Sequence, residues 1–327
     1  MLIFGTALAI VLGTTPLLKR VALRLGFMDK PSGRKIHSKP VPLLGGVAIY
    51  LGCMMALFIF DRPFVFQLVT VLLGATLISF LGLWDDRRGL KPFIKLGGQI
   101  VIIMVTVLSG IQVHFLHHPS LNLGVTFFWV LVITNAMNLL DNMDGLSGGV
   151  ATVASTFFFL LAVMNGQYLV ASLSAALLGA CLGFLYYNLN PASVFMGDTG
   201  SLFLGFMLAM VGIKLRFPGK TDLVTWMIPV IVLGLPIFDT VLVVISRLRR
   251  GLNPLTTPGK DHVSHCLAAR GMSRREVVLL LYLVCCGLGV IGMFIMHASV
   301  VEAYLVGILL LISALYALWR FEKFRLQ

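Results

Sequence analysis

Residues 277–297 read VVLLLYLVCCGLGVIGMFIMH, a run of 21 residues without a charged side chain. A helix that crosses the hydrocarbon core of a bilayer needs roughly 17–25 apolar residues, so this run predicts a membrane-spanning helix. Ser273 and Glu276, directly before the run, have the spacing of a capping box, which predicts where the helix begins.

The whole chain shares the apolar character of this run. Hydrophobic residues make up 58% and charged residues 12% of its 327 positions. Because a soluble globular domain is about a quarter charged, this composition excludes that class and favours a membrane protein. No linker-like stretch divides the sequence, so we expect a single domain over residues 1–327.

Eleven segments are apolar enough to be spanning helices, which predicts an all-α polytopic membrane protein with 10 or 11 transmembrane helices. Two of the runs are short, and ten spans are expected if one of them is re-entrant. The first run has no basic residue before it and no clear cleavage site after it, so we expect a retained helix rather than a signal peptide. The segments are 2–18, 42–60, 66–84, 96–113, 123–140, 149–164, 168–187, 201–215, 223–245, 277–297 and 300–319.

The distribution of Lys and Arg predicts the orientation of these helices. With the N-terminus outside and eleven alternating spans, 21 of the 25 basic residues fall in cytosolic segments, including the C-terminus. This is the positive-inside pattern. It accounts for most of the net charge of +12, so we expect no nucleic-acid partner. The expected location is a cytoplasmic membrane, crossed many times.

The carboxylates gather on the same predicted cytosolic face. Asp85 and Asp86 end the third span, Asp141 and Asp144 follow the fifth, and Asp198 follows the seventh. The orientation rests on basic residues alone, so the position of the acids is independent support for an active site on this face. Ionisable groups at a membrane boundary are candidates for function.

In LWDDRRGLKPF (83–93), the adjacent carboxylates of Asp85 and Asp86 repel each other. A bound divalent cation would relieve this repulsion, because hard cations take oxygen ligands, and so would a shared proton. The alternative is an ordinary loop that opens with a turn and carries basic residues for topology.

In NLLDNMDGLSGG (138–149), Asn138, Asp141 and Asp144 are each three residues apart. On a helical turn this spacing would place their side chains on one face at the membrane edge. The alternative is simple termination of a helix, since Asn, Asp and Gly are common at helix ends.

In NLNPASVFMGDTGSLFLG (188–205), two glycines bracket Asp198 and Thr199. Ser201 could cap the following helix, and the backbone N–H groups at a helix start suit a phosphate. The alternative is a capped turn without a ligand.

The longest cytosolic loop, 246–276, carries seven basic residues, and His262 and His265 lie in it beside Lys260. Histidine can bind phosphate, transfer protons or bind metal. The alternative is a basic loop that lies against anionic lipid headgroups.

Taken together, these segments predict phosphoryl transfer at the membrane surface. Carboxylates can hold a divalent cation, and basic groups can neutralise charge on phosphate, which is most of what that chemistry asks of a protein. The position at the membrane suggests one water-soluble substrate and one lipid phosphate.

The same motifs closely resemble those of the polyprenyl-phosphate N-acetylhexosamine-1-phosphate transferases. The matching stretches are DKPSGRKIHSKPVPLLGG, WDDRRGL, NAMNLLDNMDGLSGG, NPASVFMGDTGSLFLG and PIFDT, in this order along the chain. The resemblance implies transfer of a sugar-1-phosphate from a UDP-sugar to undecaprenyl phosphate, with release of UMP. It also implies Mg²⁺ as cofactor, with Mn²⁺ as a substitute, a homodimer, and a bacterial cytoplasmic membrane.

Matching the motifs assigns candidate roles to individual residues. The catalytic candidates are Asp85, Asp86, Asp141 and Asp144. The metal candidates are Asp198 and Asn188. The candidates for binding the nucleotide and its diphosphate are Asn138, Asp144, Lys260, His262 and His265, and those for the lipid phosphate are Arg87, Arg88 and Lys35.

One departure from the family pattern bears on the sugar. Many members carry His-x-His-His in the last loop, whereas this chain has DHVSHCL, with Ser264 in place of a histidine. Together with the compact loops, this favours the branch that uses UDP-N-acetylglucosamine or a relative over the branch that uses a UDP-muramoyl-peptide.

Two other functions are open on sequence grounds. A CDP-alcohol phosphotransferase also places Asp and Gly at a membrane edge, but its acids cluster in one helix pair with an Ala-Arg that does not follow Asp144 here. A cation-coupled transporter places ionisable groups near mid-bilayer, where this chain has only Asp239.

Overall fold

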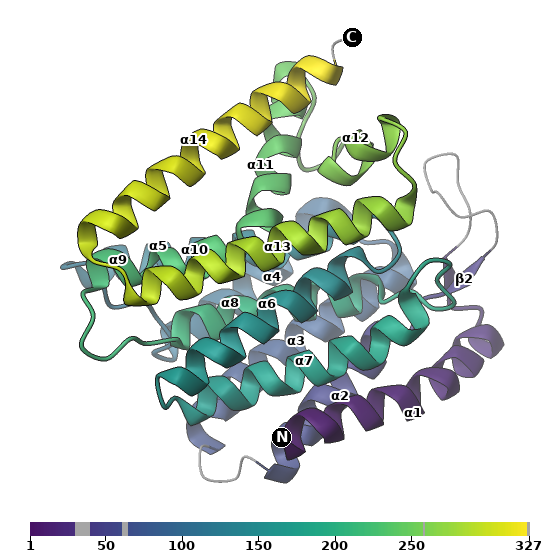
Figure 1. Ribbon diagram of the computed structural model, residues 1–327. Helices are drawn as coiled ribbons and strands as arrows, with labels where there is room; N and C mark the ends of the chain where they lie inside the picture. The colour runs from purple at the N-terminus through teal and green to yellow at the C-terminus, as the bar shows by residue number, and fades with distance from the viewer. Residues whose placement is uncertain (30–39, 61–64, 258, 326–327) are drawn as a thin grey trace. The chain divides into compact units, whose positions relative to one another are not determined.

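The computed structural model describes residues 1–29, 40–60, 65–257 and 259–325 of the chain (Figure 1). These residues form two compact units, Met1–Arg216 and Phe217–Gln327. The single-domain interpretation stays a prediction, because compactness does not tell whether each unit folds alone.

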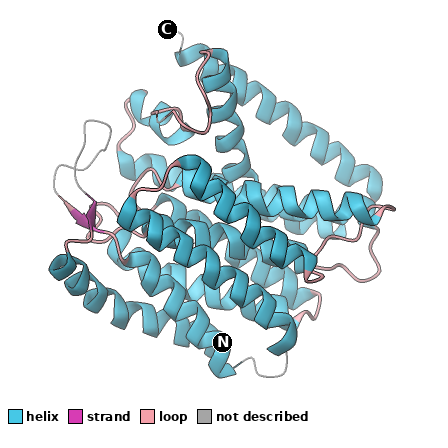
Figure 2. Cartoon of the chain, turned by 180° about the vertical axis from the view of Figure 1, so that it is seen from behind, coloured by secondary structure: helices cyan, strands magenta, loops and turns pink. Residues whose placement is uncertain are grey.

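The first unit is built from eight helices and one pair of short strands within the described residues. β1 and β2 pair antiparallel, with Met28 opposite Pro42, and are the magenta arrows in Figure 2. The elements are α1 (Leu2–Leu25), β1 (Met28–Asp29), β2 (Val41–Pro42), α2 (Gly45–Phe60), α3 (Val65–Arg88), α4 (Pro92–Leu108), α5 (Pro119–Leu140), α6 (Leu146–Met164), α7 (Tyr168–Asn188) and α8 (Gly197–Lys214).

All regular elements of the second unit are helices within its described residues. Its elements are α9 (Asp222–Thr225), α10 (Met227–Val232), α11 (Gly234–Arg249), α12 (Val263–Ala269), α13 (Arg274–His297) and α14 (Val300–Arg325). The predicted capping box is confirmed at the start of α13, where the Ser273 hydroxyl accepts the Glu276 N–H and the Glu276 carboxylate accepts the Ser273 N–H.

The prediction of an all-α polytopic membrane protein is confirmed. Seven helices of the described chain are long and apolar enough to cross a bilayer, and eight are if one bent pair counts as a span. That pair, Asp222–Val232 with Gly234–Arg249, bends by 72°. The span predicted over 223–245 is therefore formed by two helices at an angle, not by one straight helix. Pro236 has no N–H to continue the backbone ladder, and the helices separate just before it at Leu233.

Helix α8 forms the centre of the first unit. Every residue from Thr199 to Ile213 in it is buried, and it packs between α3 and α5 (Figure 1). A helix that is apolar on all sides is expected to be enclosed by other helices. Its position fixes where its first turn, and with it Asp198, lies relative to α3 and α5.

The start of α2 braces the segment that leads into α8. The N–H groups of Gly45 and Gly46 donate to the carbonyls of Phe195 and Met196, each at 3.0 Å. A Cβ at Gly46 would lie 2.2 Å from the backbone nitrogen of Gly200, so only glycine permits this approach. The chain entering α8 is thus held by backbone hydrogen bonds on the side of α2.

Candidate active site

The carboxylate of Asp86, in the last turn of α3, binds the first turn of α8. It accepts the N–H of Asp198 at 2.8 Å, and the N–H and hydroxyl of Thr199 at 3.0 and 2.6 Å. Gly197 precedes them at φ 65°, and a Cβ there would lie 2.5 Å from the Asp86 carboxylate. Because both oxygens of Asp86 are engaged by α8, its side chain positions Asp198.

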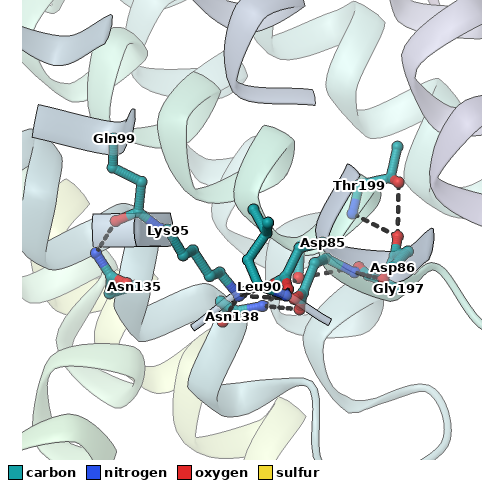
Figure 3. Close-up of polar contacts among 11 residues, drawn as sticks. Asp85, Asp86, Leu90, Lys95, Gln99, Asn135, Asn138, Gly197 and Thr199 are labelled. Atoms are coloured by element: carbon teal, nitrogen blue, oxygen red, sulfur yellow. Dashed lines mark hydrogen bonds and ion pairs between the residues drawn. The ribbon is translucent and has the colours of Figure 1, made fainter. Parts of the chain in front are cut away.

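Lys95, near the start of α4, contacts residues from three of the sequence motifs (Figure 3). Its ammonium lies 3.0 Å from Asp85 Oδ2 and 2.7 Å from Asp198 Oδ2, and it donates to Asn138 Oδ1 at 3.1 Å. The other Asp85 oxygen accepts the N–H of Leu90 at 2.7 Å. Side chains from α3, α4, α5 and α8 therefore meet around one cation.

Asn138, at the end of α5, holds Asp198 from the other side. Its amide nitrogen donates to Asp198 Oδ1 at 2.6 Å and to Ser201 Oγ at 2.8 Å. The prediction that Ser201 caps α8 is wrong, because the helix begins four residues earlier at Gly197. The side chain of Asp198 is 29% exposed against 10% for Asp85, so Asp198 is the more accessible of the two carboxylates.

Asp141 and Asp144 do not share a helical face. Helix α5 ends at Leu140, and Asp141 has ψ 55°, outside the helical region. Asp144 turns toward the loop before α8, where its carboxylate accepts the Asn190 amide at 2.9 Å and the Ala192 N–H at 3.0 Å. The predicted spacing along one face is wrong because the chain leaves the helix between Asn138 and these acids.

Asp141 lies within electrostatic range of the other carboxylates. Burial, and after it the charges of Asp198, Asp86, Asp144 and Asp29, together raise the pKa of Asp141 to about 8. A cation near these carboxylates would offset the repulsion among them.

Asn188 connects two of the motif loops. Its amide oxygen accepts the N–H of Gly145 at 3.0 Å and its nitrogen donates to the carbonyl of Val194 at 2.9 Å. With its side chain buried and both ends of the amide engaged, Asn188 holds the loop after α5 against the loop before α8. Its assignment as a metal ligand stays a prediction.

The cluster fits a divalent cation that the protein holds only in part. Carboxylate oxygens are the ligands of Mg²⁺, which proteins often bind through one or two carboxylates and the phosphates of a substrate. Asp198, whose side chain is partly exposed, and Asp141, with its raised pKa, fit this mode, whereas Asp86 is turned toward α8 and accepts three hydrogen bonds from it. Within the described ranges, no group of three or more His, Cys, Asp or Glu side chains encloses a complete metal site.

Lys95 is the residue that sequence reasoning missed. It lies ten residues after Asp85, at the border between a basic loop and an apolar run, and counted only toward topology. A lysine at the first turn of an apolar helix is a signal that could have identified it, because an ammonium there needs an acidic partner.

The predicted lipid-phosphate residues differ in their surroundings. Arg87 donates to the Leu25 carbonyl at 3.4 Å, and its guanidinium lies 5.5 Å from the centre of the Phe27 ring. Arg88 is exposed, and Lys35 lies outside the described residues. Arg87 borders a groove of about 710 Å³ whose other lining residues are apolar: Leu25, Phe27, Leu44, Leu77, Phe80, Leu81, Leu83, Trp84 and Ile102.

The second unit contains a separate cluster around Asp239. This carboxylate is 1% exposed, lies 2.7 Å from His262 Nδ1, and accepts the N–H of Val263 at 2.7 Å. It therefore fixes the orientation of the His262 ring, and leaves Nε2 as the ring atom that can meet a ligand. The ring of His265 lies 5.6 Å from that of His262, centre to centre.

The loop that carries these histidines is held by two ion pairs to the buried carboxylate of Asp261. Asp261 lies 3.0 Å from Arg247 Nε and 2.6 Å from Arg250 Nη2. Ser264, at the position that departs from the family pattern, is buried, whereas Lys260 is exposed. Asp239 was noted in the sequence only for its position, because its partner His262 is 23 residues away.

Comparison with known proteins identifies relatives of this chain. Residues 68–216 match glycosyl transferase family 4, a range that contains Asp85, Asp86, Lys95, Asn138 and Asp198. A probable undecaprenyl-phosphate N-acetylglucosaminyl 1-phosphate transferase of Bacillus subtilis is 37% identical over 290 residues, which cover 86% of this chain and 80% of the relative.

Two further relatives carry related names. The decaprenyl-phosphate N-acetylglucosaminephosphotransferase of Mycolicibacterium smegmatis is 33% identical over 315 residues, 85% of this chain and 77% of the relative. The undecaprenyl-phosphate alpha-N-acetylglucosaminyl 1-phosphate transferase of Salmonella typhimurium is 28% identical over 313 residues, 91% of this chain and 84% of the relative.

Proposed function

We propose a function for this chain from the premise that it belongs to glycosyl transferase family 4 and to its polyprenyl-phosphate sugar-1-phosphate transferases. It transfers N-acetylglucosamine-1-phosphate to a polyprenyl phosphate. The donor in this proposal is UDP-N-acetylglucosamine, the acceptor is undecaprenyl phosphate, and the second product is UMP. The lipid product would start a cell-envelope glycan.

The observation that carries this proposal is the meeting of Asp85, Asn138 and Asp198 at the ammonium of Lys95. Phosphoryl transfer needs little covalent chemistry from the protein, but it needs groups that position phosphates and offset their charge. A cluster with several carboxylates and one fixed ammonium can hold a cation on one side and a phosphate oxygen on the other.

In this proposal, the main role of Asp85 is to position the attacking lipid phosphate, not to remove a proton. A phosphate monoester has its second pKa at about 6, so a lipid phosphate is already largely dianionic at neutral pH and needs no strong base. Asp85 is held by Lys95 and by the Leu90 N–H, which suits a fixed electrostatic role. An aspartyl-phosphate intermediate is the competing route.

Mg²⁺, or Mn²⁺ in its place, is the proposed cofactor, with Asp198 and Asp141 as the residues that would hold it. When bound, the ion would neutralise charge on the diphosphate of the donor. Asn138 keeps Asp198 in place through a 2.6 Å hydrogen bond, and Asp86 keeps the first turn of α8 in place.

The His262 cluster is proposed to bind the diphosphate or sugar of the donor. The Asp239 carboxylate contacts Nδ1 of the His262 ring, so Nε2 of that ring is available to a phosphate oxygen. His265 and the exposed Lys260 lie in the same loop and would add donors. Arg87, which borders an apolar groove, is proposed to attract the phosphate of the lipid.

The proposed topology adds three helices to those that meet the criteria of length and apolarity. Helices α2 and α4 are apolar but short, and α8 is enclosed by spanning helices. With the bent pair they would give eleven spans, an outer N-terminus and a cytosolic active site in the bacterial cytoplasmic membrane. The family resemblance adds the expectation of a homodimer.

The deciding experiment measures UMP release by the purified protein in detergent. The reaction would contain undecaprenyl phosphate, Mg²⁺ and one of several UDP-sugars, with a CDP-alcohol in a parallel reaction. We expect release that requires the lipid, the metal and UDP-N-acetylglucosamine, that is lost in Asp198→Asn, and that persists in the exposed control Asp222→Asn. Product formation only with the CDP-alcohol would overturn the proposal.

A further inference from the structure

We propose that Gln99 of α4 and Asn135 of α5 form a positioning pair that holds Lys95 and Asn138 against Asp198. This inference rests on the proposed function of that cluster. The Asn135 amide nitrogen donates to Gln99 Oε1 at 2.6 Å and to the Leu131 carbonyl at 2.8 Å (Figure 3). Gln99 lies outside the motifs that the sequence singled out, and Asn135 is the first residue of NAMNLLDNMDGLSGG but was given no role there.

The pair lies directly behind the active cluster on the same two helices. Lys95 and Gln99 are four residues apart on α4, and Asn135 and Asn138 are three apart on α5, so each couple shares one helix face. Two polar contacts therefore join the helices in sequence: Lys95 with Asn138 at 3.1 Å, and Gln99 with Asn135 at 2.6 Å. The contact of Lys95 with Asn138 belongs to the active site, and the contact of Gln99 with Asn135 supports it.

The complete burial of Gln99 supports a specific role for its contact with Asn135. Its side chain is fully buried, and its Nε2 has no hydrogen-bond partner among the residues that the structure describes. A buried amide group without a partner is destabilising, and a leucine would avoid that cost. Apolar helix pairs pack in several registers, whereas a single buried polar contact selects one.

The register matters because Lys95 must reach two carboxylates at once. Its ammonium lies within 3.0 Å of both Asp85 and Asp198, so a small slide of α4 along α5 would lengthen one of these contacts. A misplacement of about 1 Å at a reacting centre can cost up to roughly 100-fold in rate. The pair thus acts through Lys95 and Asn138 without touching substrate.

The test compares kcat and KM for UMP release in five variants. Gln99→Leu and Asn135→Ala each remove the contact, and we expect kcat to fall about tenfold with KM for the UDP-sugar changed less than about twofold. The double variant should lose no more than either single variant. Gln99→Asn combined with Asn135→Gln keeps an amide pair of the same total length, and we expect it to recover most of the activity that Gln99→Asn alone loses.

Thr134→Val is the matched control. Thr134 is the neighbour of Asn135 on α5, is fully buried, and its hydroxyl has no partner among the described residues. Its variant should keep the wild-type kcat, and melting temperatures in detergent would confirm that all variants are folded. If Gln99→Leu does not fold, the comparison of Gln99→Asn with the swapped pair decides.

The inference is overturned if Gln99→Leu keeps the wild-type kcat, if the losses of the single variants add in the double variant, or if the swapped pair recovers nothing. These outcomes require an active wild-type protein. Absence of UMP release from the wild type would instead contradict the proposed function, so the two failures are distinguishable.

Discussion

Asp86 accepts the backbone N–H of Asp198 at 2.8 Å, which joins the last turn of α3 to the first turn of α8 across 112 residues of sequence. Two adjacent aspartates therefore have different tasks. Asp85 faces the ammonium of Lys95, and Asp86 holds the helix that carries Asp198. Adjacent residues on a helix point about 100° apart, which is why one motif can serve both purposes.

Asp86→Asn should reduce both stability and activity. The amide presents one acceptor oxygen where the carboxylate offers two, so part of the contact with Asp198 and Thr199 is lost. We expect a loss of about 1–3 kcal/mol in the free energy of unfolding, seen as a lower melting temperature in detergent. UMP release should fall with it, because Asp198 is displaced. Unchanged melting would contradict the role of Asp86 as a brace for α8.

Lys95→Met should abolish most of the activity with little effect on KM for the donor. The variant removes the only ammonium that the described structure places between Asp85 and Asp198, so charge on the phosphates is no longer offset. We expect kcat to fall about 100-fold or more, in the range seen when a charge-stabilising donor is removed. Lys91→Met, an exposed lysine at the start of the same helix, is the control and should retain full rates.

Asp141→Asn should reduce the pH dependence of stability in the metal-free protein. The folded-state pKa of Asp141 is raised to about 8, above the unfolded value of about 4, so the folded protein retains a proton that the unfolded chain releases. Stability should therefore fall as the pH rises from about 4 to about 8 and then level off. Melting temperatures at pH 6 and pH 8.5 with EDTA would measure this slope, which should be smaller in the variant.

Saturating Mg²⁺ should flatten the same slope in the wild-type protein if Asp141 helps to hold the ion, since a bound cation favours the carboxylate. An equal slope in wild type and Asp141→Asn would show that other groups titrate in this range, and the proposed role of Asp141 would fail.

The effects of Asp239→Asn and His262→Gln on activity should not be additive. Asp239 orients the His262 ring through its contact with Nδ1, so once either is changed the other has little left to lose. We expect each to reduce kcat/KM by about tenfold to 100-fold and the double variant to be no worse than the poorer single one. His297→Gln, an exposed histidine of the same unit, is the control. Additive losses would mean that the two residues serve separate purposes.

Much of the fold class was available before the structure. The apolar runs predicted a polytopic helical membrane protein, and the spacing of Ser273 and Glu276 predicted the first turn of α13, because both signals are local. Motif order identified the family for the same reason. Helix ends were less accessible: Asn138 lies in a helix, but Asp141, three residues on, does not. The helix ends between these two residues, and the spacing of residues in the sequence does not show where a helix ends.

The sequence by itself determined that this chain is a membrane protein, to which family it belongs, and which carboxylates to suspect. Only the tertiary structure decided which partners they have. Lys95 meets Asp198 across 103 residues, Asn138 meets it across 60, and Gln99 meets Asn135 across 36. These contacts depend on how α4, α5 and α8 pack. The packing is set by the sum of many apolar contacts along the helices. These contacts cannot be inferred from the few residues next to a lysine or a glutamine in the sequence.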